Sequence, residues 1–180
     1  MEDRKVILKI EHLCKDFDIK AKSFTGKALK LHALSDISLD IYEGETLGII
    51  GESGCGKSTL GRCLVNLHPI TSGKLVYDGK ELNRLRKKER QALSREIQMV
   101  FQDPYSSLDP RHTAADSVEE PMIVHKTPAT ARERQERTIG LFKEVGLDMQ
   151  HLNRYPHEFS GGQRQRLNIA RAIASNPRVV

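Results

Sequence analysis

The N-terminal half of the chain alternates between apolar and polar residues in several short stretches. Residues 37–41 place three apolar side chains on one side, which is the two-residue period of a half-buried strand. Weaker alternation over 6–10, and a run at 74–77 between two glycine turns, predict two further strands. The continuous apolar run 46–50 predicts a short buried strand, and the polar residues 18–32 predict a loop or hairpin.

Helical periodicity replaces this alternation after a glycine-rich break. A helix is expected from Lys57, because three leucines share one face at the spacing i, i+4, i+7. These leucines are Leu60, Leu64 and Leu67. Residues 84–95 are charged and helix-prone, and 97–101 form another short apolar strand.

The C-terminal half is predicted to be mostly helical. Residues 113–147 form two or three helical pieces, with breaks expected at Pro121 and Pro128. Gly146 is suited to end the last piece. A further helix is expected over about 163–175, capped by a serine and ended by Asn-Pro. The apolar stripe of the middle pieces is supplied by Ile139, Phe142 and Val145.

The glycine-rich break fits the phosphate-loop pattern G-x-x-x-x-G-K-[ST] at every fixed position. Main-chain N–H groups must point at phosphates, and glycines let the backbone approach without a Cβ clash. The following helix adds its positive N-terminal end. Lys57 is expected to reach the β- and γ-phosphates, Ser58 to offer its hydroxyl to Mg²⁺, and Thr59 to contact the α-phosphate. The other residues of the predicted ATP cradle are Gly51, Ser53, Gly54, Cys55 and Gly56.

A second anion site is expected at Ser160-Gly161-Gly162-Gln163, which precedes a basic helix start. A serine hydroxyl, exposed amides and a helix dipole together favour a phosphate. A Gly-Gly pair alone is weak evidence, because most such pairs are loops. About a hundred residues after a phosphate loop, the same segment is far more specific.

With these motifs in this order, the chain resembles the ATP-binding cassette family. The phosphate loop, the signature segment 160–166 and the segment 100–104 around Gln102 match in register, with Phe159 where leucine is commoner. The resemblance implies a P-loop α/β fold with a mixed sheet, an antiparallel strand layer and an inserted helical subdomain over about residues 104–165. All of residues 1–180 are then one partial ATP-binding domain.

The resemblance also implies roles for single residues. Phe17 matches the aromatic residue that stacks on adenine, although a plain core role for it is about equally consistent with the sequence. Gln102 matches the residue that meets Mg²⁺ and the attacking water. Lys57, Gln102, Ser160 and Gly162 are the expected catalytic set. Two cassettes pair head to tail in the family, so that residues 160–163 would cover the γ-phosphate bound by a second ATPase subunit.

Several stretches resemble the oligopeptide and dipeptide importer branch of the family, notably 102–111, 42–48 and 155–160. The expected partners are transmembrane permease subunits and, indirectly, a solute-binding protein. The protein is then expected at the cytoplasmic face of the inner membrane. Nickel and other small solutes are alternative cargoes, because the ATPase does not touch the cargo.

Composition narrows the function classes without selecting one. The net charge of +5 fits nucleic acid, an anionic membrane or a phosphate ligand. The basic residues of 84–95 keep a soluble ATPase acting on DNA or ribosomes open as an alternative, but no aromatic–basic interleaving supports it. The three cysteines are too few for a disulfide framework, and no apolar stretch approaches the roughly 20 residues of a membrane span.

The expected chemistry is incomplete at the C-terminal end. In the family an apolar strand ending in Asp-Glu follows the signature helix, and a γ-phosphate-sensing histidine comes later. Residues 179–180 resemble only the start of that strand. We therefore expect these 180 residues to be a truncated form with little ATPase activity, and a non-catalytic nucleotide sensor is a third alternative.

Overall fold

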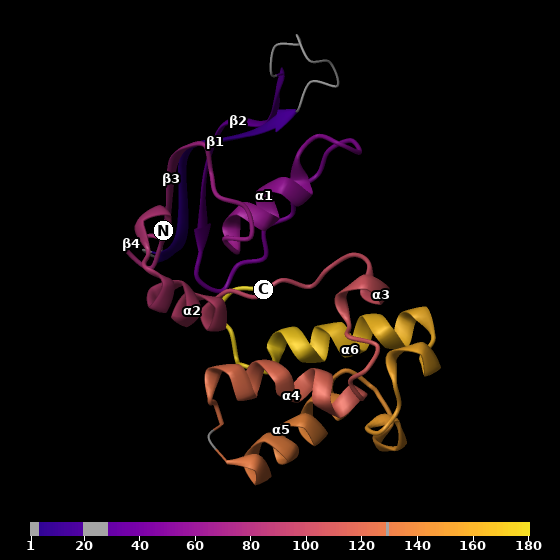
Figure 1. The fold of residues 1–180 in the computed structure, drawn as a ribbon. Helices are drawn as coiled ribbons and strands as arrows, with labels where there is room; N and C mark the ends of the chain where they lie inside the picture. The colour runs from indigo at the N-terminus through magenta and orange to yellow at the C-terminus, as the bar shows by residue number, and fades with distance from the viewer. Residues whose placement is uncertain (1–3, 20–28, 129) are drawn as a thin grey trace. The chain divides into compact units, whose positions relative to one another are not determined.

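The computed structural model describes residues 4–19, 29–128 and 130–180. It divides into two compact units, Met1–Arg90 (unit 1) and Gln91–Val180 (unit 2), shown as a ribbon in Figure 1. Unit 1 contains the sheet and unit 2 is helical. No helix of the described residues is long and apolar enough to cross a bilayer.

The sheet of unit 1 has four antiparallel strands in the order β2-β1-β3-β4. Its strands are β1 (Val6–Ile19), β2 (Leu29–Tyr42), β3 (Ser72–Tyr77) and β4 (Lys80–Glu81). The antiparallel layer and the strands predicted at 6–10, 37–41 and 74–77 are confirmed. Both long strands extend into the predicted hairpin at 18–32, and the tip of that hairpin lies outside the described residues.

The long strands are held by a buried face and interrupted by bulges. Leu8, Ile10 and Leu13 are almost fully buried on β1, and Leu75 of β3 packs in the same core. The pairing of β1 with β3 shifts between Glu11 and Cys14. At this bulge a Cβ on the third strand's glycine, Gly73, would come within 2.3 Å of a main-chain oxygen of β1, so the close approach needs glycine.

Helix α1 (Lys57–Leu64) follows the glycine-rich loop, as predicted, and Figure 1 shows it beside the sheet of the same unit. It buries Leu60 and Cys63. Leu67 lies beyond the helix end and is 54% exposed, so the predicted three-leucine stripe is wrong at its last member. The 3-10 turn η1 (Leu82–Arg84) and helix α2 (Lys87–Glu96) come next in the chain.

Residues 46–50 do not form the predicted strand. Leu47 and Ile49 are 45% and 46% exposed, and Ile50 is 98% exposed. An apolar run favours burial, but a strand also needs a neighbouring strand to pair with its backbone N–H and C=O groups. No strand of the described residues pairs with this segment. The phosphate loop therefore follows an irregular segment rather than a sheet strand.

The predicted strand at 97–101 is also reduced, to a single parallel bridge between Ile97 and Val179. Gln98 N donates to the Val179 main-chain oxygen at 2.9 Å within unit 2. The parallel part of the predicted mixed sheet is therefore represented by this one bridge in the described residues. A ladder gains stability from successive pairs, and here only one pair is available.

The described residues of unit 2 contain four complete α-helices, two 3-10 turns and the last six residues of α2. The helices are α3 (Pro104–Ser107), α4 (Ala114–His125), α5 (Ala131–Glu144) and α6 (Gly161–Ile173). The turns are η2 (Met149–His151) and η3 (Pro156–Glu158). Its core combines Val118 and Met122 of α4, Leu141 and Phe142 of α5, and Leu167 of α6.

The helix ends of unit 2 agree with the predicted signals. Gly146 has φ +69°, and the next residue, Leu147, donates its N–H to the Phe142 main-chain oxygen at 2.8 Å, the six-to-one bond that ends helices at such a glycine. Ser160 caps α6 through a reciprocal pair of bonds with Gln163. The predicted break at Pro121 is wrong, because α4 continues through it. The buried residues on both sides of the proline hold the helix in the core despite the missing N–H.

Candidate functional site: two anion-facing loops

The phosphate loop, residues 51–58, folds around the side chain of its own lysine. Lys57 Nζ donates to the main-chain oxygens of Gly51 at 2.8 Å and Glu52 at 2.7 Å. Helix α1 starts without a side-chain cap and without an acidic residue in its first turn. Its first N–H groups and the lysine ammonium thus form one positive site, and no carboxylate of the described residues forms an ion pair with that ammonium.

Gly56 fixes the shape of this loop. Its backbone is left-handed, with φ +101°, where an L side chain is strained. A Cβ at this position would also lie 2.6 Å from the main-chain oxygen of Ala33 and 2.9 Å from the Leu34 side chain. The loop therefore approaches β2 more closely than any other residue type allows.

The residues of this loop fit a polyphosphate. Ser53, Gly54, Cys55 and Ser58 are exposed, so the Ser58 hydroxyl is accessible to a ligand. The Cys55 main-chain N–H donates to the Glu52 main-chain oxygen at 3.3 Å. Lys57 Nζ also donates to the Cys55 sulfur at 3.5 Å. A phosphate oxygen can replace the two main-chain oxygens as the lysine's acceptor, since a charged acceptor bonds an ammonium more strongly.

Phe17 lies on β1 in unit 1 and is half-buried. The His68 ring meets it edge-to-face, with centroids 5.4 Å apart, and Lys15 Nζ lies 4.6 Å from its ring centroid. These contacts orient the Phe17 ring. The stacking of this ring on adenine stays a prediction.

Gln102 belongs to unit 2 and is exposed. The next residue, Asp103, caps α3 by accepting a bond from Tyr105 N at 2.9 Å. Hydrogen bonds from the Ser106 side chain and from the Tyr105 amide lower the pKa of Asp103. This cap fixes the chain immediately after Gln102 while the Gln102 side chain itself lies at the surface.

Two residues of the signature segment, Ser160 and Gln163, form hydrogen bonds with each other. Ser160 N donates to Gln163 Oε1 at 2.9 Å, and Gln163 N donates to Ser160 Oγ at 3.3 Å, which makes a capping box. Gly161 and Gly162 are exposed, and a Cβ on either would meet no atom within 4 Å. The two glycines thus leave open backbone at a helix N-terminus, where N–H groups lack helical acceptors.

A polar stripe on α6, which sequence reasoning missed, joins this helix to the segment after Gln102. Arg164 lies over the Tyr105 ring, with its guanidinium carbon 5.6 Å from the centroid. Asn168 Nδ2 donates to the Pro104 main-chain oxygen at 3.4 Å, and Arg171 Nη1 donates to that of Ser107 at 2.6 Å. The spacing i, i+4, i+7 of these three polar residues was the available signal.

A cavity of about 250 Å³ lies beside this stripe, between residues 98–101, α4 and α6. Its polar lining includes the ion pair of Arg171 with Glu120, at 3.1 Å. His125 also lines it, and burial together with the charge of Arg95 lowers the His125 pKa. The lining includes Phe101, which directly precedes Gln102 in the chain, and Asn168 and Arg171 of the polar stripe.

The candidate residues therefore form two groups. The structure brings the phosphate loop together in unit 1, and it links the Gln102 segment to the signature helix in unit 2. Among the described residues, no group of three or more His, Cys, Asp and Glu side chains could hold a metal ion.

Comparison with known proteins gives one family. A family model described as "ABC transporter" matches residues 34–180. The oligopeptide transport ATP-binding protein OppF of Bacillus subtilis (strain 168) is 46% identical over 175 residues, covering 97% of this chain and 55% of that protein. The glutathione import ATP-binding protein GsiA of Pectobacterium atrosepticum is 46% identical over 174 residues, covering 97% of this chain and 28% of that protein. The chain thus spans about half of one relative and about a quarter of the other.

Solved structures give the same fold. The dimeric ATP-binding cassette MJ0796, in a post-hydrolysis state bound to ADP and Pi, superposes with a TM-score of 0.83 and 34% sequence identity. That match covers 94% of this chain and 70% of the solved one. CbiO1 of Clostridium perfringens, part of the ABC transporter complex CbiONQ, matches with a TM-score of 0.73 and 28% identity, covering 96% of this chain and 62% of that one.

Proposed function

The chain belongs to the ABC transporter family, and from this premise we propose that it binds ATP and powers a membrane importer of oligopeptides or dipeptides. The observation that carries the proposal is the phosphate loop, in which the Lys57 ammonium and an uncapped helix start form a positive site. The similarity to an oligopeptide transport protein over nearly the whole chain supports the cargo class.

The triphosphate is held by residues 51–59, with Lys57 turning from its two main-chain acceptors to the β- and γ-phosphates. Ser58 and Gln102 are the proposed Mg²⁺ contacts, through a hydroxyl and an amide oxygen. The bound Mg²⁺ supplies charge neutralisation of the phosphates. Phe17 is the proposed platform for adenine, held at its edge by His68.

The remaining site residues are proposed to act on a second ATPase subunit. Residues 160–163 offer a hydroxyl and open amides at a helix N-terminus, which suits the γ-phosphate of a neighbouring cassette. Residues 1–180 then form one cassette domain with a helical subdomain over about 104–165. The α6 stripe couples the signature to the Gln102 segment, so that nucleotide-driven closure reaches the permease.

The proposed setting is the cytoplasmic face of the inner membrane, on transmembrane permease subunits and indirectly on a solute-binding protein. Nucleic acid is not an expected partner. Import of glutathione is the second candidate, because the relative named for it is as similar to this chain as the oligopeptide relative. Both candidates use the same ATP chemistry.

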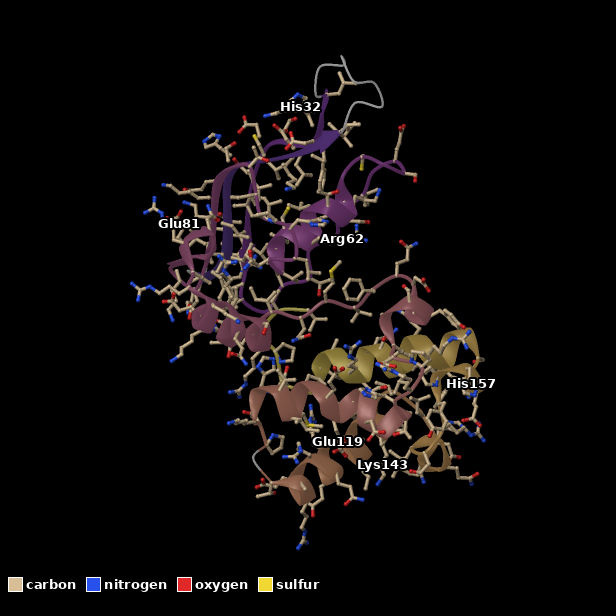
Figure 2. The ribbon with its side chains drawn as sticks, in the orientation of Figure 1. His32, Arg62, Glu81, Glu119, Lys143 and His157 are labelled. Atoms are coloured by element: carbon tan, nitrogen blue, oxygen red, sulfur yellow. The ribbon has the colours of Figure 1, made fainter. Side chains whose placement is uncertain are left out.

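Titration of the protein with Mg²⁺ and a fluorescent ATP analogue tests the proposal. Lys57→Ala is expected to weaken nucleotide binding by about a hundredfold or more, because it removes the cation that faces the phosphates. Lys143→Ala, an exposed lysine of α5 labelled in Figure 2, is the matched control and is expected to change nothing. Nucleotide binding that survives Lys57→Ala would refute the proposed site.

Uptake of a labelled tripeptide, and separately of glutathione, by cells that carry the Lys57→Ala change in the whole gene then distinguishes the two cargoes. The cargo whose uptake falls to background is the one this ATPase serves. If neither falls while nucleotide binding is lost, the protein is an ATPase of another process.

A further inference from the structure

The positive charge of this protein is concentrated in one short segment. Residues 80–95 contain seven Lys and Arg and two Glu, a net charge of +5, which equals the net charge of all 180 residues. The rest of the chain is therefore balanced. In the structure this segment comprises β4, η1 and most of α2.

Both carboxylates of the segment are used locally. Glu81, labelled in Figure 2, pairs with Arg84 at 3.3 Å, and Glu89 Oε2 accepts the main-chain N–H of Arg86 at 2.7 Å. Arg90 Nε donates to the main-chain oxygen of Leu85. Within the described part of the chain, the charged groups of three exposed neighbours form no ion pair or hydrogen bond. These are Arg86, Lys87 and Lys88, here called the basic surface.

The helix turns these charges away from its packed side. Leu93 is the buried residue of α2. Because each residue of a helix is rotated by about 100° from the one before it, Lys87 and Lys88 lie on the side of α2 that faces away from Leu93. Both lysines are exposed, as are Arg86 and Arg90. No large apolar side chain of this segment is exposed, so a partner would be held by charge rather than by inserted apolar groups.

The extent of the charge favours a surface over a single ligand. A helix rises about 1.5 Å per residue, so the cations of α2 and the preceding turn extend further than one phosphate group can bridge. The segment contains no aromatic residue on which bases could stack. Clusters of four to eight Lys and Arg on one helix are characteristic of contact with anionic headgroups.

We propose that the basic surface docks this protein on the anionic phospholipid headgroups of the membrane that holds its permease. The proposal rests on the proposed function, which brings the protein to a membrane. The headgroup contact holds the ATPase close to the bilayer independently of the permease. It adds to the permease contact, since two tethers at one surface act at high effective concentration.

Co-sedimentation with vesicles of phosphatidylglycerol and phosphatidylcholine tests the proposal, without nucleotide and without permease. We expect binding at low salt that is lost at about 1 M salt, where the Debye length is about 3 Å. Vesicles of phosphatidylcholine alone are expected to bind little. The triple variant R86Q/K87Q/K88Q is expected to lower the partition coefficient by about a hundredfold.

The control variant K126Q/R132Q/K143Q removes the same charge from exposed positions of unit 2. It is expected to keep vesicle binding within about fivefold of the unchanged protein. Equal losses in both triple variants would overturn the proposal, because net charge alone would then explain the binding. Equal binding to neutral vesicles, or tighter binding of a single-stranded oligonucleotide to the same surface, would also overturn it.

Nucleotide titration of the same variants separates this inference from the proposed function. R86Q/K87Q/K88Q is expected to bind Mg²⁺-nucleotide normally, because its residues lie outside the phosphate loop. Absent vesicle binding with normal nucleotide binding rejects the basic surface alone. Absent nucleotide binding with normal vesicle binding rejects the proposed ATPase alone.

Discussion

The phosphate loop of unit 1 and the signature segment of unit 2 both place glycines before a helix, but the glycines are there for different reasons. In the phosphate loop, Gly56 has a left-handed backbone and lies too close to the Ala33 oxygen for any Cβ. In the signature segment, Gly161 and Gly162 have space around them within this chain. The first loop needs glycine to fold, whereas nothing in the fold demands glycine in the second.

The helix starts differ in the same way. Helix α1 begins without a side-chain cap, so its first amides are left for a ligand. Helix α6 begins with a complete capping box between Ser160 and Gln163. The first N–H groups of the helix after the phosphate loop thus have no side-chain cap. The signature segment is a capped helix start, and its exposed glycine backbone suits a partner molecule. A substitution in the phosphate loop should therefore change both protein stability and nucleotide binding. A substitution in the signature segment should change binding to a partner without a similar change in stability.

The largest expected effect on stability and binding comes from substituting alanine for one glycine in each loop. Gly56→Ala should lower the free energy of unfolding by about 2–4 kcal/mol and abolish nucleotide binding, because a left-handed backbone and a clash act together. Gly162→Ala should change stability by less than about 0.5 kcal/mol, since alanine suits a first helical turn. Denaturant unfolding and nucleotide titration check both, with ATP-dependent dimerisation by size-exclusion chromatography.

Gly162→Ala is expected to lose ATP-dependent dimerisation while it keeps nucleotide binding. If it destabilised the protein as much as Gly56→Ala, or if it dimerised normally, the proposed difference between the two loops would be wrong.

A smaller effect is expected at the cap. Ser160→Ala should lower the free energy of unfolding by about 1 kcal/mol, because it removes the hydroxyl that accepts the Gln163 amide. Thr130→Ala is the matched control, since Thr130 forms the same kind of capping box on α5. Both variants should unfold at similarly reduced denaturant concentrations.

Only Ser160→Ala should also weaken ATP-dependent dimerisation, because only that hydroxyl lies at the proposed contact with a second subunit. Equal dimerisation of the two variants would show that Ser160 serves the helix alone.

The smallest effect is a pH dependence at Asp116 of unit 2. The Thr113 hydroxyl, bonded to Asp116 at 2.6 Å, holds the pKa of Asp116 below its usual value of about 3.9. As pH falls, the unfolded chain therefore binds this proton first, and the stabilisation, complete above about pH 5, is lost through about pH 4 and below. Asp116→Asn should reduce the fall in helix stability between neutral and acid pH, measured by circular dichroism.

Among the described residues, lowered carboxyl pKa values are concentrated in unit 2. Only Glu11 of unit 1, beside Lys9, shows one. In unit 2 the same holds for Asp103, Asp109, Asp116 and Glu133. Amide exchange should therefore show unit 2 loosening first in acid. Simultaneous loosening of both units, or an unchanged acid response of Asp116→Asn, would remove this distinction.

Local signals were sufficient for much of this molecule. The phosphate loop followed from residue spacing alone, because glycine freedom, a lysine and a helix start are properties of one short segment. The cap at Ser160 and the helix end at Gly146 were predicted for the same reason. The family predicted from three motifs in register is confirmed by the match over residues 34–180.

Predictions that depended on a neighbour were the ones that failed or were missed. The apolar run 46–50 lacks a pairing strand among the described residues, so its Ile50 side chain is exposed instead of buried. Pro121 stays helical because packing of Val118 and Met122 outweighs the missing N–H. The edge-to-face contact between Phe17 and His68 joins residues far apart in sequence, so no local pattern could indicate it.

The sequence by itself determined the family and the residues on which the proposed chemistry depends: a lysine in a glycine loop and a serine cap before two glycines. Only the tertiary structure decided which glycines the fold requires, and that Asn168 and Arg171 tie the signature helix to the segment after Gln102. The reason is the range of the forces involved. Backbone conformation and capping act within one helical turn, whereas steric contact and strand pairing depend on atoms that folding brings from elsewhere in the chain.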